Sequence, residues 1–492
     1  MNLSYKKIYS TFIVFSLFII FRIDYLVVDS LSFQEWDPLA RISTALIERD
    51  TLYKYLFPNY WWLPGHFYFI RLYFFFFNSS QYLVLFHAVC LGGAISTVYY
   101  LAINEIKSNF NMMIVALVAV TFSLNSIFFL ISLQALSEPF FLLLVAISFI
   151  FYKRLLSDEF KVLDLVGFLF FANFACLTRF EGWLIFSVLG LYLGYNKKLT
   201  FLIKLLPLAI APAIWFGIQF YEKGNVFYWL GILEREGSIK ANLLGSMTIF
   251  IKIFKTFLVS LLPLSLLYFI KDKRKTNVGR SSFLCIVILF SFLTFQIFEG
   301  NIEPSERYSV TCLFMLYIFV VFTLATAKLE GYWAKFLSLY IVLSVLLVNS
   351  LFWFQNMSVH YDLMPKKTNE LIEQVSKLDL EPGRTIFFPR VFRRDTYLKL
   401  KLGWFNAGHV EKIIDDNSYI FMRVINVNPW KFVKKEQILE RKRLKYIVYV
   451  NGVSVEKFSE MQLKYLEFPE ELIRNFRVFW KNRAGIIYQR VE

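Results

Sequence analysis

Long apolar runs separated by short polar segments occupy the chain up to about residue 355. A helix that crosses a bilayer needs about 20 consecutive, mainly apolar residues, and this template predicts about eleven such helices here. The predicted spans lie near residues 8–28, 81–102, 110–132, 137–153, 161–179, 180–196, 200–221, 247–270, 281–299, 307–327 and 334–355. The pattern therefore indicates an α-helical, multi-pass membrane protein.

The first predicted loop, residues 29–80, is long enough to hold structure of its own. Residues 38–49 and 67–77 both have a helical pattern, and the second stretch is rich in aromatic residues. We expect this second helix to lie along the bilayer surface, as amphipathic aromatic helices do. The loop is therefore part of the membrane domain, which we assign to residues 1–355.

Beyond residue 355 the long apolar runs stop and charged residues mix with apolar ones. This segment has one helix signal and three strand signals, at 368–377, 385–388, 446–451 and 485–489. We predict that residues 356–492 form a small soluble α/β domain.

Composition agrees with a membrane protein. Of the 492 residues, 57% are hydrophobic, 20% aromatic and only 18% charged, against about 25% charged residues in soluble domains. The net charge of +16 would suit nucleic acid, but lysine and arginine gather in short segments and form no continuous basic face. We therefore expect the lipid bilayer, and no nucleic acid, as a partner. The four cysteines lie within apolar runs without metal-ligand spacing, so no disulfide is expected.

The basic segments predict the orientation of the chain. Lysine and arginine are enriched in cytoplasmic loops, and a cytoplasmic N-terminus puts Lys153–Arg154, Lys197–Lys198 and residues 271–280 on that side. A cytoplasmic N-terminus makes the first loop extracytoplasmic, and an odd number of spans then places the C-terminal domain on the same outer side. We expect the membrane to be the plasma (inner) membrane of a bacterium.

The first loop contains the strongest candidate for a general base. Asp37 follows Glu35 and Trp36 shortly after the first span, and a carboxylate there can accept a proton from an acceptor hydroxyl or amine. The alternative is that Asp37 only caps the next helix, with Pro38 at its first position. Glu35 is the second choice for the acid.

A second acid and two arginines fall at the outer ends of later spans. Glu138 opens the fourth span, where it either serves the site or simply complements the helix dipole. Arg179 and Arg307 could each hold a phosphate through charge-assisted hydrogen bonds. The alternative is that Arg179 pairs with Glu181, and Arg307 with its neighbour Glu306, to neutralise the turns.

The sequence contains few signals for a metal site or a nucleotide site. His66 and His87 are isolated in sequence, and lone histidines near aromatic residues are more often core or interface residues than metal ligands. The chain lacks H-E-x-x-H, P-loop, G-x-G-x-x-G and Asp-x-Asp motifs. No metal ligands are therefore assigned, and dependence on a divalent cation is left open.

Five short motifs lie at the ends of the apolar spans. They are W-D-P-L-A-R at 36–41, W-L-P-G-H-F-Y at 62–68, S-E-P at 137–139, L-T-R-F-E-G-W at 177–183 and E-R-Y at 306–308. In this order between apolar spans they resemble the GT-C superfamily of polyprenyl-phosphate-dependent glycosyltransferases. The similarity is to family 39, which includes protein O-mannosyltransferases and lipid A aminoarabinose transferases, and it covers about residues 1–355.

The resemblance implies a catalytic acid early in the first loop, which Asp37 matches, and a donor that carries a sugar on a polyprenyl phosphate. Many members have an Asp-Glu pair where this chain has Asp37-Pro38. From the motifs we also assign supporting roles to four further residues and to Glu35. These four are Arg41, His66, Glu181 and Tyr308.

The predicted function is therefore transfer of a sugar from a polyprenyl-phosphate donor to a glycan, lipid or protein acceptor on the non-cytoplasmic face. Asp37 is the predicted base of an inverting displacement, Glu138 positions the acceptor or sugar, and Arg179 and Arg307 bind the phosphate. The alternative is a multi-pass transporter or lipid flippase. That class is expected to show charges deep within several spans and repeated halves, and neither is evident in this sequence.

Overall fold

The computed structural model describes most of the helical part of the chain and the strands of its C-terminal part. The described residues are 3–22, 41–42, 45, 63–77, 82–106, 108–157, 159–197, 200–226, 277–298, 309–327, 336, 339, 343, 370–371, 373–374, 377–378, 385–387, 444–450, 476–481 and 485–491. The chain divides into two compact units. Residues 1–28, 56–69 and 84–359 form the first unit, and residues 29–55, 70–83 and 360–492 form the second.

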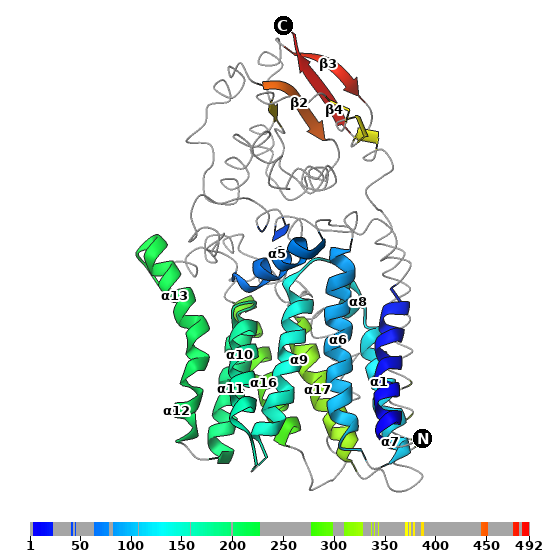
Figure 1. The fold of residues 1–492 in the computed structure, drawn as a ribbon, viewed down its shortest axis with the longest axis vertical. Helices are drawn as coiled ribbons and strands as arrows, with labels where there is room; N and C mark the ends of the chain where they lie inside the picture. The colour runs from blue at the N-terminus through cyan, green and yellow to red at the C-terminus, as the bar shows by residue number, and fades with distance from the viewer. Residues whose placement is uncertain are drawn as a thin grey trace. The chain divides into compact units, whose positions relative to one another are not determined.

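The first unit is a bundle of apolar helices that run alongside one another (Figure 1). Its described helices are α1 (Leu3–Ile20), the start of α5 (Gly65–Phe77), α6 (Leu83–Ile103), α7 (Asn109–Ser123), α8 (Ser126–Ser132), α9 (Ser137–Leu155), α10 (Val162–Cys176), α11 (Glu181–Lys197), α12 (Phe201–Leu205), the 3-10 helix η2 (Leu206–Ala209), α13 (Ile210–Lys223), α16 (Asn277–Phe298) and α17 (Val310–Thr326). Among the described residues, three stretches are long and apolar enough to cross a membrane, namely Leu83–Ile103, Phe201–Tyr221 and Asn277–Gln296. The prediction of a mostly helical protein with apolar helices is confirmed.

Two predicted spans are interrupted. The stretch 110–132 breaks after α7, because the Asn125 side chain accepts hydrogen bonds from the backbone N–H groups of Ile127 and Phe128 and so caps α8. The stretch 200–221 changes from an α-helix to the 3-10 helix η2 around Pro207, which has no backbone N–H to donate. There Asn173 of α10 donates to the carbonyl of Pro207 and accepts from the N–H of Ala211.

Other predicted elements lie partly or wholly outside the described residues. The first span begins at Leu3 rather than near residue 8, and its helix ends at Ile20, followed by a turn at 21–22. The predicted span 247–270 is outside the described residues, as is most of 334–355.

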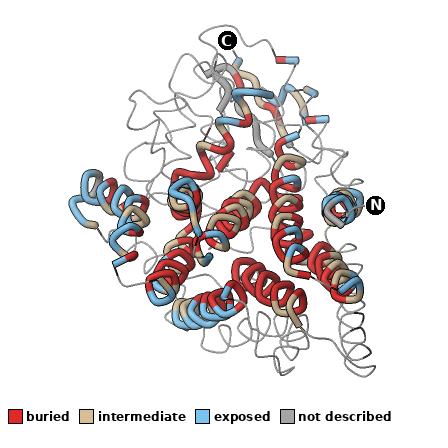
Figure 2. The backbone as a smooth tube through the Cα atoms, turned by 60° about the horizontal axis from the view of Figure 1, so that its bottom comes forward, coloured by how far each residue is buried: buried red, intermediate tan, exposed pale blue. Residues whose placement is uncertain are grey.

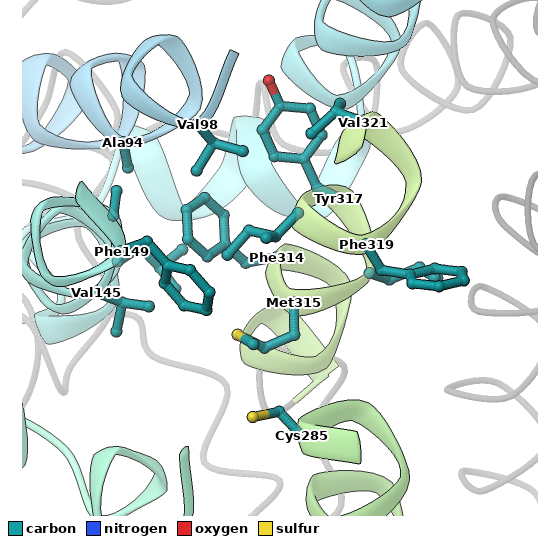
Figure 3. Close-up of a cluster of buried hydrophobic side chains, with 14 of the residues drawn as sticks. Ala94, Val98, Val145, Phe149, Cys285, Phe314, Met315, Tyr317, Phe319 and Val321 are labelled. Carbon is teal, nitrogen blue, oxygen red and sulfur yellow. The ribbon is translucent and has the colours of Figure 1, made fainter. Parts of the chain in front are cut away.

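The centre of the bundle is α17, nearly all of whose side chains are buried. It packs against α7, α9 and α16, and the Tyr317 hydroxyl donates to the Ile95 carbonyl of α6 at 3.0 Å. Phe314, Met315 and Tyr317 lie among side chains from α6, α9 and α16 (Figure 3). The buried faces of the helices turn toward this interior, while outer faces such as that of α13 remain exposed (Figure 2). A helix that is apolar on all sides is expected to occupy such a central position.

One end of the bundle carries basic side chains. Lys153, near the end of α9, forms an ion pair with Glu105 and donates to the Leu101 carbonyl. Arg154 contacts Asp164 at the start of α10, at 3.2 Å. Since α9 ends and α10 begins here, the start of α9 and the end of α10 lie at the opposite end of the bundle.

The described strands of the second unit form one four-stranded sheet of order β1-β2-β4-β3. Its strands are β1 (Thr385–Phe387), β2 (Leu444–Val450), β3 (Phe476–Lys481) and β4 (Gly485–Arg490). β1 pairs with β2 in parallel, and the other two pairings are antiparallel. Phe476 faces Arg490 across the β3–β4 pair, with the guanidinium 5.4 Å from the ring centre. The three predicted strands correspond to β1, β2 and β4, and β3 was not predicted.

Candidate active site

Two helix starts and one turn build a charged cluster at the end of the bundle opposite the basic residues. α9 begins with Ser137, Glu138 and Pro139, and proline is tolerated in a first turn because the N–H groups there have no intrahelical partner. α10 ends at Cys176, a short turn carries Arg179, and α11 begins at Glu181. Since α9 packs against α10 and α10 against α11, the three segments come together.

The turn between α10 and α11 is held by close backbone contacts. The Trp183 indole N–H donates to the Cys176 carbonyl at 2.9 Å, which satisfies a carbonyl at the end of α10. A side chain on Gly182 would lie 3.1 Å from the Cys176 Cα atom, so glycine allows the start of α11 to approach the end of α10. The position of Arg179 is therefore set by the local backbone.

Arg179 lies between two carboxylates. Its Nη1 is 2.7 Å from Glu138 Oε1, and its Nη2 is 2.6 Å from Glu181 Oε1. Its Nε also donates to both carboxylate oxygens of Glu181, at 3.1 and 3.2 Å, and Nη1 donates to the Ser137 hydroxyl at 3.1 Å. One guanidinium thus joins the start of α9 to the start of α11.

The cluster is shielded from solvent. The exposed fraction of the side chain is 0% for Glu138, 8% for Arg179 and 11% for Glu181. Charges so deeply buried are costly unless they are paired and hydrogen-bonded, and all three meet this condition. Both carboxylates also stand in the first turn of a helix, where the macrodipole favours negative charge.

The start of α5 lies against this cluster. The Gly65 N–H donates to the Leu177 carbonyl at 2.8 Å, and a Cβ atom at Gly65 would lie 2.5 Å from Thr178 Oγ1. Phe69, one turn further along α5, stacks on Phe140 of α9 with ring centres 4.1 Å apart. α5 therefore contacts both segments that supply the ion pair.

Two buried histidines meet at the start of α5. His66 Nε2 and His87 Nε2 of α6 are 3.1 Å apart, and both residues are fully buried. No sequence pattern pairs these two histidines, because they occupy different apolar helices. His87 is thus a residue that sequence reasoning considered and set aside. Among the described residues no group of three or more histidine, cysteine, aspartate or glutamate side chains could hold a metal ion.

The structure brings together only some of the predicted site residues. Glu138, Arg179 and Glu181 form the cluster, and His66 lies beside it in the first turn of α5. Arg41 is a buried helical residue of the second unit. Four predicted residues, Glu35, Asp37, Arg307 and Tyr308, lie outside the described residues.

Another buried charge escaped the sequence analysis. Arg22, just after α1, is fully buried and donates to the Ser132 hydroxyl and to the Phe18 and Ser123 carbonyls, at 2.6, 2.9 and 2.7 Å. Its guanidinium carbon lies 3.6 Å from the Phe18 ring centre. The sequence signal that could have identified it is an arginine placed directly at the end of an apolar run.

The sequence matches no protein-family model and no curated protein. Its structure is similar to two crystal structures of ArnT from Cupriavidus metallidurans. With the form bound to undecaprenyl phosphate, the TM-score is 0.57 at 11% identity over 97% of this chain and 98% of that chain. With the apo form, the TM-score is 0.58 at 11% identity over 97% of both chains. The chain has the ArnT fold.

At 11% identity this likeness is one of fold, and the resemblance to the GT-C superfamily stays a prediction. Three stretches of the described helices have the length and apolar composition needed to cross a membrane. The similarity to ArnT extends over nearly the whole chain, so it includes the C-terminal part for which the motifs offered no match. Assignment to family 39 stays a prediction.

Proposed function

We propose that this chain is a membrane glycosyltransferase that moves a sugar from a polyprenyl-phosphate donor to an acceptor. The observation that carries the proposal is the fold shared over 97% of the chain with ArnT, whose crystal structure contains undecaprenyl phosphate. The buried cluster of Glu138, Arg179 and Glu181 supports it, because ionisable groups within membrane proteins are costly and usually functional.

The proposed reaction is a direct displacement at the anomeric carbon. Asp37 accepts the proton of an acceptor hydroxyl or amine, whose oxygen or nitrogen forms a bond to the anomeric carbon. The bond from that carbon to the phosphate oxygen breaks, and its electron pair leaves with the polyprenyl phosphate. The configuration at the anomeric carbon is inverted.

The charged cluster suggests how the remaining roles divide. Arg179 already faces two carboxylates, so we propose that Arg307 takes the larger share of the phosphate charge and that Arg179 contributes while it orients Glu138. Glu138 then positions the acceptor or the sugar. Preorganised charges of this kind stabilise the charge that develops on a leaving group.

We further propose that the site and the C-terminal domain are extracytoplasmic, at a bacterial inner membrane. The separation between the basic end, with Lys153 and Arg154, and the Glu138–Arg179 end is consistent with the positive-inside rule. The acceptor is a glycan, lipid or protein, and dependence on a divalent cation is to be measured directly.

The test is transfer from radiolabelled polyprenyl-phosphate sugars by the purified chain in liposomes. Asp37→Asn is expected to lower the rate at least about a hundredfold, as loss of a general base does. Asp164→Asn is the matched control, since this carboxylate lies at the opposite end of the bundle beside Arg154. An unaffected Asp37→Asn variant would contradict the mechanism. If wild type consumes no donor but moves labelled lipid across the bilayer, the protein is instead a transporter or flippase.

A further inference from the structure

We infer that His66 and His87 share a single proton between their Nε2 atoms and act as positioning residues for the transfer reaction. The positioning role rests on the proposed function. The shared proton rests on the geometry of the two rings alone. The two Nε2 atoms are 3.1 Å apart, and the rings meet nearly edge to face at 77°. At this separation one nitrogen must donate and the other must accept.

The Phe69 ring lies against both histidines and connects them to the charged cluster. Phe69 is stacked near His66, with ring centres 6.2 Å apart, and meets His87 edge to face at 5.1 Å. The same Phe69 ring stacks on Phe140, two residues beyond Glu138. A shift of the histidine rings therefore moves the surface against which the start of α9 packs.

The backbone beside His66 makes the second connection. Gly65 donates to Leu177 and lies directly against Thr178, next to Arg179. The start of α5 thus contacts the chain on both sides of the Glu138–Arg179 ion pair. The histidine contact fixes α5 to α6 at this point, and through α5 it fixes the separation of the two ionic partners.

The number of protons on the pair decides whether the contact survives. With one shared proton, an N–H faces a lone pair. If both rings are protonated, two N–H groups face each other at 3.1 Å and the rings must separate. Histidine takes up protons between about pH 5 and 8, so acidification is expected to release the start of α5 from the cluster.

Other ionisable groups stand on the elements around the pair. Among the described residues they include Glu138 on α9, Arg179 and Glu181 at the α10–α11 turn, Cys90 on α6, and Tyr68, Arg71 and Tyr73 along α5. They are identical in the variants compared below. A difference between the pH profiles of those variants therefore belongs to the histidine pair.

Glutamine and leucine at position 87 separate a proton-sharing contact from simple packing. The His87→Gln amide offers both a donor and an acceptor, so it can bond to His66 whether that ring is neutral or protonated. The acid limit of a variant is the pH below which its transfer rate falls to half of the maximum. For His87→Gln this limit should therefore lie at lower pH than for wild type. His87→Leu removes the partner and should lower kcat about tenfold near neutral pH, because the buried His66 Nε2 loses this hydrogen bond. The difference from wild type should shrink at acid pH, where wild type loses the contact as well. His66→Gln is the mirror-image variant and should behave like His87→Gln.

The shared proton is measured directly by nitrogen NMR. The chain has four histidines, so replacing His360 and His409 by glutamine leaves only this pair of imidazoles. Near neutral pH we expect one protonated and one unprotonated Nε2 that are coupled to each other. Two protonated Nε2 atoms, or no coupling, would overturn the inference.

Transfer and unfolding measurements complete the test. Coincident acid limits for wild type, His87→Gln and His66→Gln, both in transfer rate and in thermal unfolding in detergent, would disprove the positioning role. If wild type transfers no sugar while the NMR coupling and the shifted unfolding profiles are observed, the proposed function fails and the proton-sharing pair stands.

Discussion

Glu138 Oε1 lies 2.7 Å from Arg179 Nη1, and both side chains are buried although they come from separate segments of the chain. Because Glu181 binds the other side of the same guanidinium, one cation joins two buried carboxylates. This arrangement makes Arg179 the member of the cluster whose loss leaves the most uncompensated charge.

Replacement of Arg179 should therefore destabilise the protein more than replacement of either acid. We expect Arg179→Gln to lower the free energy of unfolding by about 3–5 kcal/mol, because two buried carboxylates lose their cation. Glu138→Gln leaves the Arg179–Glu181 pair in place and should cost less. Denaturant titration in detergent measures both. Arg154→Gln is the matched control, because the Arg154 side chain that pairs with Asp164 is 61% exposed. This variant should lose at most about 1 kcal/mol of stability, as exposed ion pairs do.

Gly65 should tolerate no side chain. In Gly65→Ala the new Cβ atom would lie 2.5 Å from Thr178 Oγ1 and 2.9 Å from the Leu177 carbonyl oxygen, so the start of α5 must move. We expect a loss of about 1–3 kcal/mol in stability, as for other overpacked sites, together with slower sugar transfer. Gly217→Ala, where nothing lies within 4 Å, should be neutral or stabilising. Equal behaviour of the two variants would show that α5 does not seat on the α10–α11 turn.

Arg22 should not be replaceable by lysine. Its guanidinium makes hydrogen bonds through Nε and both Nη atoms to three separate oxygens, and a lysine ammonium cannot reproduce that planar arrangement. Arg22→Lys is expected to cost about 2 kcal/mol or more in thermal or denaturant unfolding, because buried acceptors lose their donors. Arg280→Lys, at an exposed position of α16, is the control. A stable Arg22→Lys variant would mean that charge alone is needed there.

The cysteines should be unreactive in the folded protein. Cys90, Cys176, Cys285 and Cys312 are all buried as free thiols. We expect a maleimide reagent to label none of them in detergent until the protein is unfolded, and mass spectrometry to find no disulfide. Lys481→Cys, on an exposed position of β3, should be labelled at once and so validates the reagent. Labelling of a native cysteine before unfolding would contradict the packing around it.

Local patterns were sufficient for much of the fold. Hydrophobic run length predicted α9, α10, α11 and α17 within a few residues, because a helix in an apolar environment needs a continuous apolar stretch. The breaks at Asn125 and Pro207 were not predicted. They depend on a side-chain cap and on Asn173, which reaches η2 from another helix. β3 was missed because most of its side chains are exposed and its place is decided by pairing with β4.

The sequence by itself determined that the protein has helices long and apolar enough to cross a membrane and that Glu138 and Glu181 stand at helix starts, since both follow from the order of residue types. It also limited the candidates for the site to a few acids, arginines and histidines. Only the tertiary structure decided that Glu138 meets Arg179 and that His66 meets His87. The physical reason is that such contacts depend on how whole helices pack side by side, and the buried partners of a charge are selected by that packing rather than by neighbours in the chain.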